Sequence, residues 1–247
     1  GGLAHDFNNV LAGIVGTISV MKLNSLITNN PDLNESINII EKASLRASNM
    51  VQQLLAISRK NEITLKTFDL NKSVEHVRNI CENTFDKSVS IICNYNPEPA
   101  MIMADPTQIE QVILNILVNG YHAMTIMKNS DEHNGGILKI NIEKAEFSDY
   151  SHLTNNVNLD LWSLKISNNG VGIPKSNISK IFDPFFSTKD KEKGSGLGLS
   201  MVYNIIKRHK GYIDVTSSEG LGSTFTLFFR ASTLDDSETI NEDESVV

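Results

Sequence analysis

Apolar residues recur every three to four positions in two runs that together cover about the first sixty residues. The first run spans residues 3–27, and the second extends from about Leu33 to Arg59. This spacing predicts two amphipathic helices. The segment "TNNPD" lies between the runs, and its asparagines and Pro31 are typical of a helix end followed by a helix start. We therefore predict an antiparallel helical hairpin.

A single hairpin of this kind cannot bury both sides of its apolar stripe. A second copy of the chain would cover the exposed side, so the pattern predicts a homodimer in which two hairpins form a four-helix bundle. The predicted stripe contains Leu3, Phe7, Val10, Leu11, Ile14, Ile18, Met21 and Leu26 in the first helix, and Ile37, Ile40, Ala47, Val51 and Leu54 in the second.

The pattern changes around "KNEITLKTFDL", and strands and helices are mixed from there to about residue 230. Asp69 is a suitable N-cap for the first of these helices. The elements do not alternate regularly, so we predict an α+β sandwich rather than a doubly wound sheet. The predicted helices are 69–85, 107–127 and 197–209, and the predicted strands are 89–95, 100–106, 136–147, 161–169, 211–217 and 223–229.

These patterns divide the 247 residues into a hairpin (1–62), an α+β domain (63–231) and a tail (232–247). The composition, with 40% apolar and 21% charged residues, is that of a globular protein. No apolar run approaches the roughly 20 residues that cross a bilayer. The chain begins inside a periodic segment, so we expect it to be part of a longer protein, whose remaining portion would carry any membrane anchor.

The net charge of −7 is concentrated in the tail. Residues 235–244, "DDSETINEDE", hold six acidic residues and no basic one, which leaves −1 for the remaining chain. No basic field is available to attract a phosphate backbone, so we do not expect nucleic-acid binding. We interpret the tail as a disordered segment or a linker. The only cysteines, Cys81 and Cys93, lack CxxC spacing and indicate reduced thiols in the cytoplasm.

Two glycine-bearing stretches carry the strongest chemical signal. "NNGVGIP" (168–174) follows a predicted strand, and "GSGLGLS" (194–200) opens a predicted helix. Glycine allows close backbone approach, and a helix N-terminus offers free N–H groups to phosphate. The segment between them contains "IFDPFFSTK" and several lysines, as a mobile lid over phosphates would.

An amide pair and a histidine add to this picture. "NILVNG" places Asn115 and Asn119 one turn apart on one helix face, where amide oxygens suit Mg²⁺; alternatively, both could simply decorate a surface helix. His5 and Asp6 in "LAHDFNN" stand on the first helix. Taken alone, they would be read as a solvated pair.

Taken together, these stretches resemble the transmitter region of a sensor histidine kinase. "LAHDFNN" is similar to the histidine box, most closely that of hybrid members. "DPTQIEQVILNILVNG" resembles the asparagine box, "NNGVGIP" and "GSGLGLS" the glycine boxes, and "IFDPFFSTK" the phenylalanine box. The resemblance covers residues 3–230. It implies a dimerisation and phosphotransfer hairpin, followed by an ATP-binding sandwich of the gyrase and chaperone type.

The resemblance also implies roles for single residues. His5 would attack the γ-phosphate of ATP and pass the phosphoryl group to an aspartate of a receiver domain. Asp6 would act as general base or orient the imidazole, and Asn9 would position water for dephosphorylation of the partner.

In the second domain, the resemblance implies that Asn119 holds Mg²⁺ with Asn115 nearby. Phe182 and Phe185 would pack at the lid hinge, and His122 is a candidate phosphate contact. The four other histidines, His76, His133, His152 and His209, lack metal-site spacing and are read as surface or capping residues. The remaining implied nucleotide contacts are Asn168, Gly170, Gly172, Lys189, Gly194, Gly196, Leu197 and Gly198.

Asn168 departs from the family pattern, which has an aspartate that accepts the adenine amino group. An amide can still accept one hydrogen bond but loses the charge. A charge-assisted bond contributes roughly 1.5–3 kcal/mol, so ATP affinity could fall about 10- to 150-fold. An alternative function is therefore an ATP-impaired module that is phosphatase-biased or docks a receiver. A chaperone or topoisomerase relative would share the nucleotide fold but would not explain the histidine box.

Overall fold

The computed structural model describes residues 13–14, 16–23, 30–41, 44, 64–127, 135–154, 156, 159–188 and 196–232. The chain divides into two compact units, Gly1–Asn61 and Glu62–Val247. None of the helices in the described part is both long and apolar enough to span a membrane.

Most of the described residues of the first unit are helical, whereas Lys22 and Leu23 form a turn. Residues 13–14 and 16–21 are helical, as are 31–41 and 44. The second helix begins at Pro31, two residues earlier than predicted, because the side-chain oxygen of Asn30 accepts the N–H of Leu33 at 3.2 Å and caps it. Lys22 pairs with Glu41 and ties the two helices together. The other parts of both predicted helices lie outside the described residues.

Of the described members of the predicted apolar stripe, two are buried within one chain. Ile18 and Ile37 are each 4% exposed, whereas Ile14, Met21 and Ile40 are between 39% and 50% exposed. The isolated hairpin therefore leaves part of its apolar stripe in contact with water.

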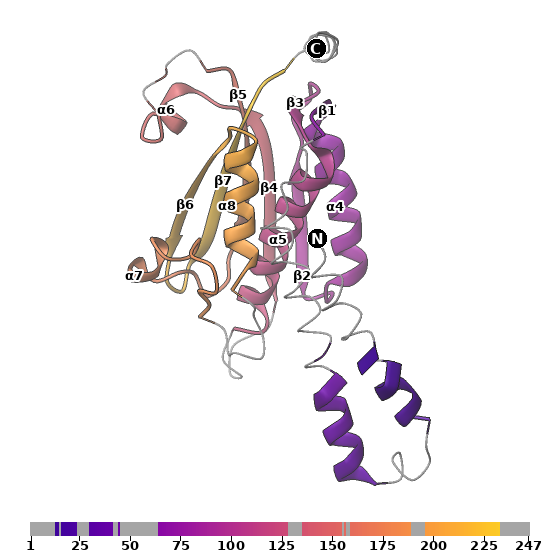
Figure 1. The fold of residues 1–247 in the computed structure, drawn as a ribbon. Helices are drawn as coiled ribbons and strands as arrows, with labels where there is room; N and C mark the ends of the chain where they lie inside the picture. Colours follow the sequence, from indigo (N-terminus) through magenta and orange to yellow (C-terminus); the bar gives the residue numbers. More distant parts are fainter. Residues whose placement is uncertain are drawn as a thin grey trace. The chain divides into compact units, whose positions relative to one another are not determined.

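The second unit is an α+β sandwich, as predicted (Figure 1). Its elements are β1 (Lys66–Asp69), α4 (Leu70–Thr84), β2 (Val89–Asn94), β3 (Met101–Ala104), α5 (Pro106–Met124), β4 (Gly136–Lys144), α6 (Phe147–Tyr150), β5 (Leu161–Asn168), α7 (Lys175–Ile178), α8 (Gly198–Arg208), β6 (Tyr212–Ser218) and β7 (Gly222–Arg230).

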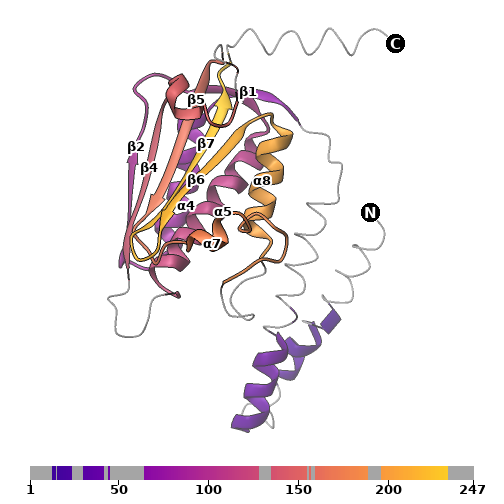
Figure 2. The ribbon, with the colours of Figure 1, turned by 90° about the vertical axis from the view of Figure 1, so that its left-hand side faces the viewer.

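The main sheet has five strands in the order β2-β4-β5-β7-β6. Only β2 and β4 are parallel, and the other neighbours are antiparallel. Helices α4, α5 and α8 lie together on one face of this sheet (Figure 2). The apolar core fills the layer between them. It includes Leu117 of α5, Val202 of α8 and Leu164 of β5, all fully buried.

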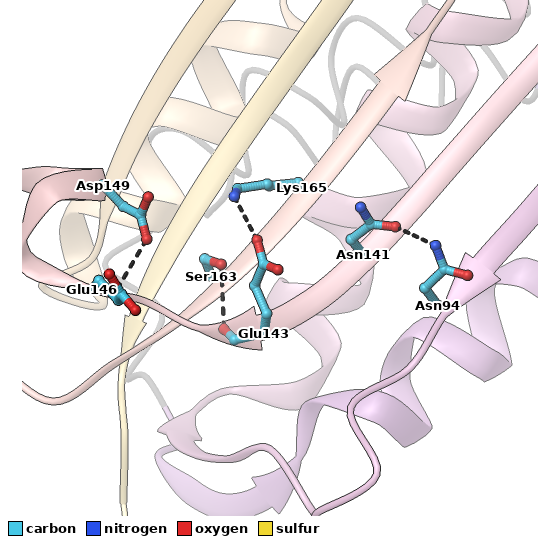
Figure 3. A network of polar contacts seen from close by, with 7 residues as sticks. All are labelled: Asn94, Asn141, Glu143, Glu146, Asp149, Ser163 and Lys165. Atoms are coloured by element: carbon cyan, nitrogen blue, oxygen red, sulfur yellow. Dashed lines mark hydrogen bonds and ion pairs between the residues drawn. The ribbon is translucent and has the colours of Figure 1, made fainter.

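The opposite face of the sheet is largely polar. On it, Asn94 of β2 donates to Asn141 of β4 at 2.8 Å, and Lys165 of β5 pairs with Glu143 of β4 (Figure 3). This alternation of apolar and polar positions is that of an antiparallel sheet with one covered face. The loop that contains α6 covers one end of this face, where a small separate cluster forms from Tyr150, Leu161 and Phe228.

A second sheet pairs β1 with β3. The sequence did not predict β1, because its four residues show too little alternation and their partner lies more than thirty residues away. Ser232 also joins this sheet, since its N–H donates to the carbonyl of Met101 at 3.0 Å. Both cysteines are free thiols, and burial raises the pKa of Cys81 to about 11, so this thiol is protonated at neutral pH.

Candidate functional site

The amide pair predicted on α5 lies against the first residue of α8. Asn115 donates its Nδ2 hydrogen to the carbonyl of Gln111 at 2.8 Å. A Cβ added to Gly198 would be 3.2 Å from Oδ1 of Asn115 and 3.8 Å from Nδ2 of Asn119. The structure thus brings Asn115, Asn119 and Gly198 together, and the absence of a side chain at Gly198 leaves the Asn115 oxygen uncovered on that side.

Asn168, the last residue of β5, is held by two hydrogen bonds. Its Oδ1 accepts the N–H of Gly170 at 3.0 Å, and its Nδ2 donates to the carbonyl of Ser223 at 3.4 Å. These partners define the orientation of the amide. An amide oxygen has two lone pairs, so Oδ1 can accept one further hydrogen bond, such as that of an adenine amino group.

The first glycine stretch packs between α5 and the turn that joins β6 to β7. A Cβ on Gly170 would lie 2.6 Å from the carbonyl oxygen of Ala123, which also accepts the N–H of Val171 at 3.1 Å. Gly172 has a φ of +72°, and a Cβ there would lie 2.0 Å from the carbonyl oxygen of Ser218. Only glycine fits these two positions without a shift of the backbone.

Gly120 lies between two groups of candidate residues, one around Gly198 and the other around Asn168. It follows Asn119 on α5, and a Cβ at Gly120 would lie 3.4 Å from both Cβ and Nδ2 of Asn168. The end of β5 therefore packs directly against α5. The group around Gly198 and the group around Asn168 both lie beside this one helix.

The segment "IFDPFFSTK", which contains three phenylalanines, is hydrogen-bonded to Gly196. The N–H of Phe185 donates to the carbonyl of Gly196 at 3.0 Å, and both residues have a φ of +67°. Phe182 does pack, with its ring centroid 5.3 Å from that of Tyr203, and its role at a lid hinge stays a prediction. The predicted packing is wrong for the side chain of Phe185, which is 63% exposed, because the left-handed backbone turns it away and Phe186 packs against the core instead.

Leu197 and His122 occupy different environments. The side chain of Leu197 is fully buried, so any contact that this residue makes with a ligand would come from its backbone. Leucine has no side-chain acceptor that could cap α8, and the helix N-terminus favours an anion. His122 is partly buried in the last turn of α5, three residues after Asn119, with its ring 5.9 Å from that of Tyr121.

Five candidate residues lie outside the described residues: His5, Asp6, Asn9, Lys189 and Gly194. Their roles stay predictions.

Sequence reasoning missed two residues that support the first glycine stretch. Oδ1 of Asn169 accepts the N–H of Ile137 at 2.8 Å and anchors the stretch to the start of β4. The hydroxyl of Ser217 accepts the N–H of Ile173 and donates to the carbonyl of Gly222, both at 2.8 Å. The doubled asparagine of "NNGVGIP" was a visible signal for Asn169, whereas nothing in the sequence marked Ser217.

The residues present suit a nucleotide with a hard cation. The described residues contain no group of three or more His, Cys, Asp or Glu side chains that could hold a metal by themselves. The uncovered amide oxygen of Asn115 is instead a neutral hard donor, of the kind that supplements phosphate oxygens around Mg²⁺. The glycine backbone and the N-terminus of α8 add N–H donors for phosphate.

Two family models match the chain. The model described as "Histidine kinase-, DNA gyrase B-, and HSP90-like ATPase" matches residues 104–233. The model described as "His Kinase A (phospho-acceptor) domain" matches residues 1–63. Together they match the whole of the first unit and residues 104–233 of the second.

Comparison with individual proteins indicates the same family. Sensor kinase CckA of Brucella abortus is 35% identical over 92% of this chain and 23% of its own length. The chain spans less than half the length of the curated relatives that it matches.

Two solved structures have a similar fold. Full-length ShkA in complex with AMPPNP has a TM-score of 0.70 at 17% identity, over 94% of this chain and 45% of that one. Histidine kinase ThkA in complex with response regulator protein TrrA has a TM-score of 0.62 at 25% identity, over 93% of this chain and 60% of that one. The chain therefore belongs to the histidine kinase-, DNA gyrase B- and HSP90-like ATPase family and, with its phospho-acceptor domain, is the transmitter region of a histidine kinase.

Proposed function

We propose that this chain is the core of a two-component sensor kinase that uses ATP to phosphorylate His5 and then transfers the phosphoryl group to a receiver-domain aspartate. Residues 1–62 would form the dimerisation and phosphotransfer hairpin, 63–231 the ATP-binding domain and 232–247 a linker. A location in the cytoplasm follows from the use of ATP, with any membrane anchor in the remaining part of the protein.

The closeness of Gly198 to Asn115 and Asn119 is the observation that carries this proposal. It joins the second glycine stretch to the amide pair in one place, at the N-terminus of α8, where Leu197 provides no side-chain cap. Mg²⁺ held by Asn119, with Asn115 nearby, would neutralise phosphate charge. Lys189, Gly194 and His122 would contribute further phosphate contacts. Phosphoryl transfer depends mainly on such positioning and charge neutralisation.

The phosphotransfer itself would use three residues of the hairpin. A nitrogen of the His5 imidazole forms a P–N bond as the bond between the γ-phosphorus and the bridging oxygen of ATP breaks, which leaves ADP. Asp6 would accept the imidazole proton or hold the ring. Transfer to the receiver then breaks the P–N bond and forms a P–O bond on an aspartate, and Asn9 would position water for the later hydrolysis.

A homodimer is part of the proposal. Ile14, Met21 and Ile40 of the predicted stripe are exposed in the single chain, and a second hairpin would cover them. A receiver domain is proposed as the second partner, in agreement with the response regulator that accompanies ThkA in its crystal structure. The alternative of an ATP-impaired or phosphatase-biased module is not favoured by these relatives, which are named as kinases.

The nucleotide site is tested most sharply with two asparagines that make the same local bond. Asn115 and Asn83 each donate to the carbonyl four residues earlier at 2.8 Å, on α5 and α4 respectively. Asn115→Ala and Asn83→Ala therefore lose the same intrahelical contact. We expect Asn115→Ala to weaken binding of ATP in the presence of Mg²⁺ by about 10-fold, the effect of one strong contact, as measured by isothermal titration calorimetry.

Asn83→Ala should bind like the parent protein, and removal of Mg²⁺ with EDTA should reduce the difference between the two variants. Equal affinity for both variants with Mg²⁺ present would contradict the placement of the nucleotide. Failure of the parent to bind ATP would contradict the proposed function itself.

A further inference from the structure

His209 joins the end of α8 to the start of α5. Its Nδ1 lies 2.8 Å from the carbonyl oxygen of Ile205, on its own helix. Its Nε2 accepts the backbone N–H of Asp105 at 3.1 Å. Asp105 is the N-cap of α5, and its Oδ1 accepts the N–H of Gln108 at 3.2 Å. A single side chain thus connects two helices that both carry candidate site residues.

Both hydrogen bonds can form only with the neutral imidazole in one tautomer. The carbonyl of Ile205 is an acceptor, so Nδ1 must carry the proton. The N–H of Asp105 is a donor, so Nε2 must be unprotonated. A protonated imidazole would present an N–H to the N–H of Asp105, and this bond would be lost.

The bond from Asp105 is the end of a series of contacts along the α5–α8 pair. The two helices lie side by side (Figures 1 and 2), and they run in opposite directions, since the start of one meets the end of the other. In the middle, Gln111 donates to the sulfur of Met201 at 3.0 Å. At the far end, Gly198 meets Asn115 and Asn119. The position of α8 along α5 therefore determines how Gly198 faces the amide pair.

We propose that neutral His209 is a positioning residue for the nucleotide site: it fixes α8 along α5 and so holds Gly198 against Asn115 and Asn119. This inference rests on the proposed function, because it concerns the same nucleotide. His209 does not itself contact the candidate site, and its influence passes through the two helices.

The surroundings of His209 keep it neutral near physiological pH. Burial lowers the pKa of His209, and the charge of Arg208 acts in the same direction, whereas the hydrogen bond to Ile205 and the charge of Asp105 raise it. A histidine whose pKa is lowered in the folded state gives its full stabilisation above its unfolded-state value of about 6.5. That stabilisation is lost as the pH falls below this value through the lowered pKa.

Two substitutions of His209 distinguish the effect of its hydrogen bond with Asp105 from the effect of its protonation. His209→Phe keeps a ring but removes both hydrogen bonds. His209→Gln keeps an oxygen acceptor for the N–H of Asp105 and removes the titration. The control is His76→Gln, which replaces an exposed histidine that faces Glu110 between α4 and α5. Circular dichroism and a thermal melt of each full-chain variant would establish that it is folded.

The measurement is the dissociation constant of Mg²⁺–ATP at pH 8 and pH 5.5. ATP itself titrates in this range, so the ratio of the two constants in each variant is compared with the ratio in His76→Gln. At pH 8 we expect His209→Phe to bind about 2- to 10-fold more weakly, the effect of one lost hydrogen bond. His209→Gln should bind like the parent at pH 8 and lose less affinity than the parent at pH 5.5.

Two results would overturn the inference alone: parent-like affinity of folded His209→Phe at pH 8, or the same pH ratio in His209→Gln as in the parent. If the parent protein binds no ATP at either pH, the proposed function fails, and this role of His209 fails with it. The two failures are therefore distinguishable.

Discussion

Gly222 lies against the carbonyl oxygen of Asn168, so closely that a Cβ added to Gly222 would be 1.9 Å from that oxygen. The two residues stand at the ends of neighbouring antiparallel strands, where Asn168 is paired with Ser223. The last residue of β5 is thus clamped by the first residues of β7. The same residue carries the amide that we expect to meet adenine.

Gly222→Ala, at the first residue of β7, should destabilise the domain far more than Gly220→Ala in the turn just before it. Both glycines have positive φ values, +105° and +77°, but a Cβ at Gly220 meets nothing within 4 Å. We expect Gly220→Ala to lower the free energy of unfolding by about 1 kcal/mol, from backbone strain alone. Gly222→Ala adds a steric clash and should cost about 3 kcal/mol or more. Urea denaturation of both variants would test this, and equal losses would contradict the clamp.

Asn168→Asp should bind ATP more tightly than the parent. The carboxylate keeps the bond from Gly170 and gives any bond to the adenine amino group a full charge. It also loses the donor to Ser223, so we expect a gain of about 10-fold, at the low end of what a charge-assisted bond provides.

The control for this substitution is Asn169→Asp, read by calorimetric titration with ATP. It adds the same charge one residue away, where an oxygen can still accept the N–H of Ile137. A similar gain in both variants would show a general electrostatic effect rather than a contact with adenine.

Gly198→Ala should weaken nucleotide binding without lowering the stability of the domain. Alanine is favoured over glycine in a helix by roughly 0.5–1 kcal/mol, and the closest atom to its Cβ would be Oδ1 of Asn115 at 3.2 Å. We expect the free energy of unfolding to stay equal or rise, while the affinity for Mg²⁺–ATP falls about 10-fold as the methyl group covers that oxygen. Unchanged affinity in a folded variant would rule out a ligand position between Gly198 and Asn115.

Local signals in the sequence predicted most elements of the second unit. Asp69 was recognised as an N-cap, and it does accept the N–H of Asn71. The strands with clear alternation, β4 and β5, begin where the pattern placed them, although β4 ends at Lys144 rather than at residue 147, where α6 begins. Pairing was not predictable: the parallel partnership of β2 with β4 joins segments more than forty residues apart, and periodicity carries no information on partners.

Local sequence patterns likewise predict only part of the candidate site. Glycine and asparagine spacing marked Asn115, Asn119, Gly170 and Gly198 as candidates, because helix and turn chemistry restrict which residues can stand there, and their roles stay predictions. The support from Ser217 depends on how β6 packs beside the first glycine stretch, which only the folded chain reveals. The orientation of Phe185 depends on a backbone conformation with positive φ that its residue type does not favour.

The central claim is that ATP phosphorylates His5, and intact-protein mass spectrometry tests it most directly. The parent, His5→Gln and the control His76→Gln would each be incubated with Mg²⁺ and ATP and then treated with acid. We predict the mass gain of one phosphoryl group in the parent and in His76→Gln, its loss after acid, and no gain in His5→Gln. A gain that persists in His5→Gln, or no gain in the parent and none in Asn168→Asp, would contradict the account.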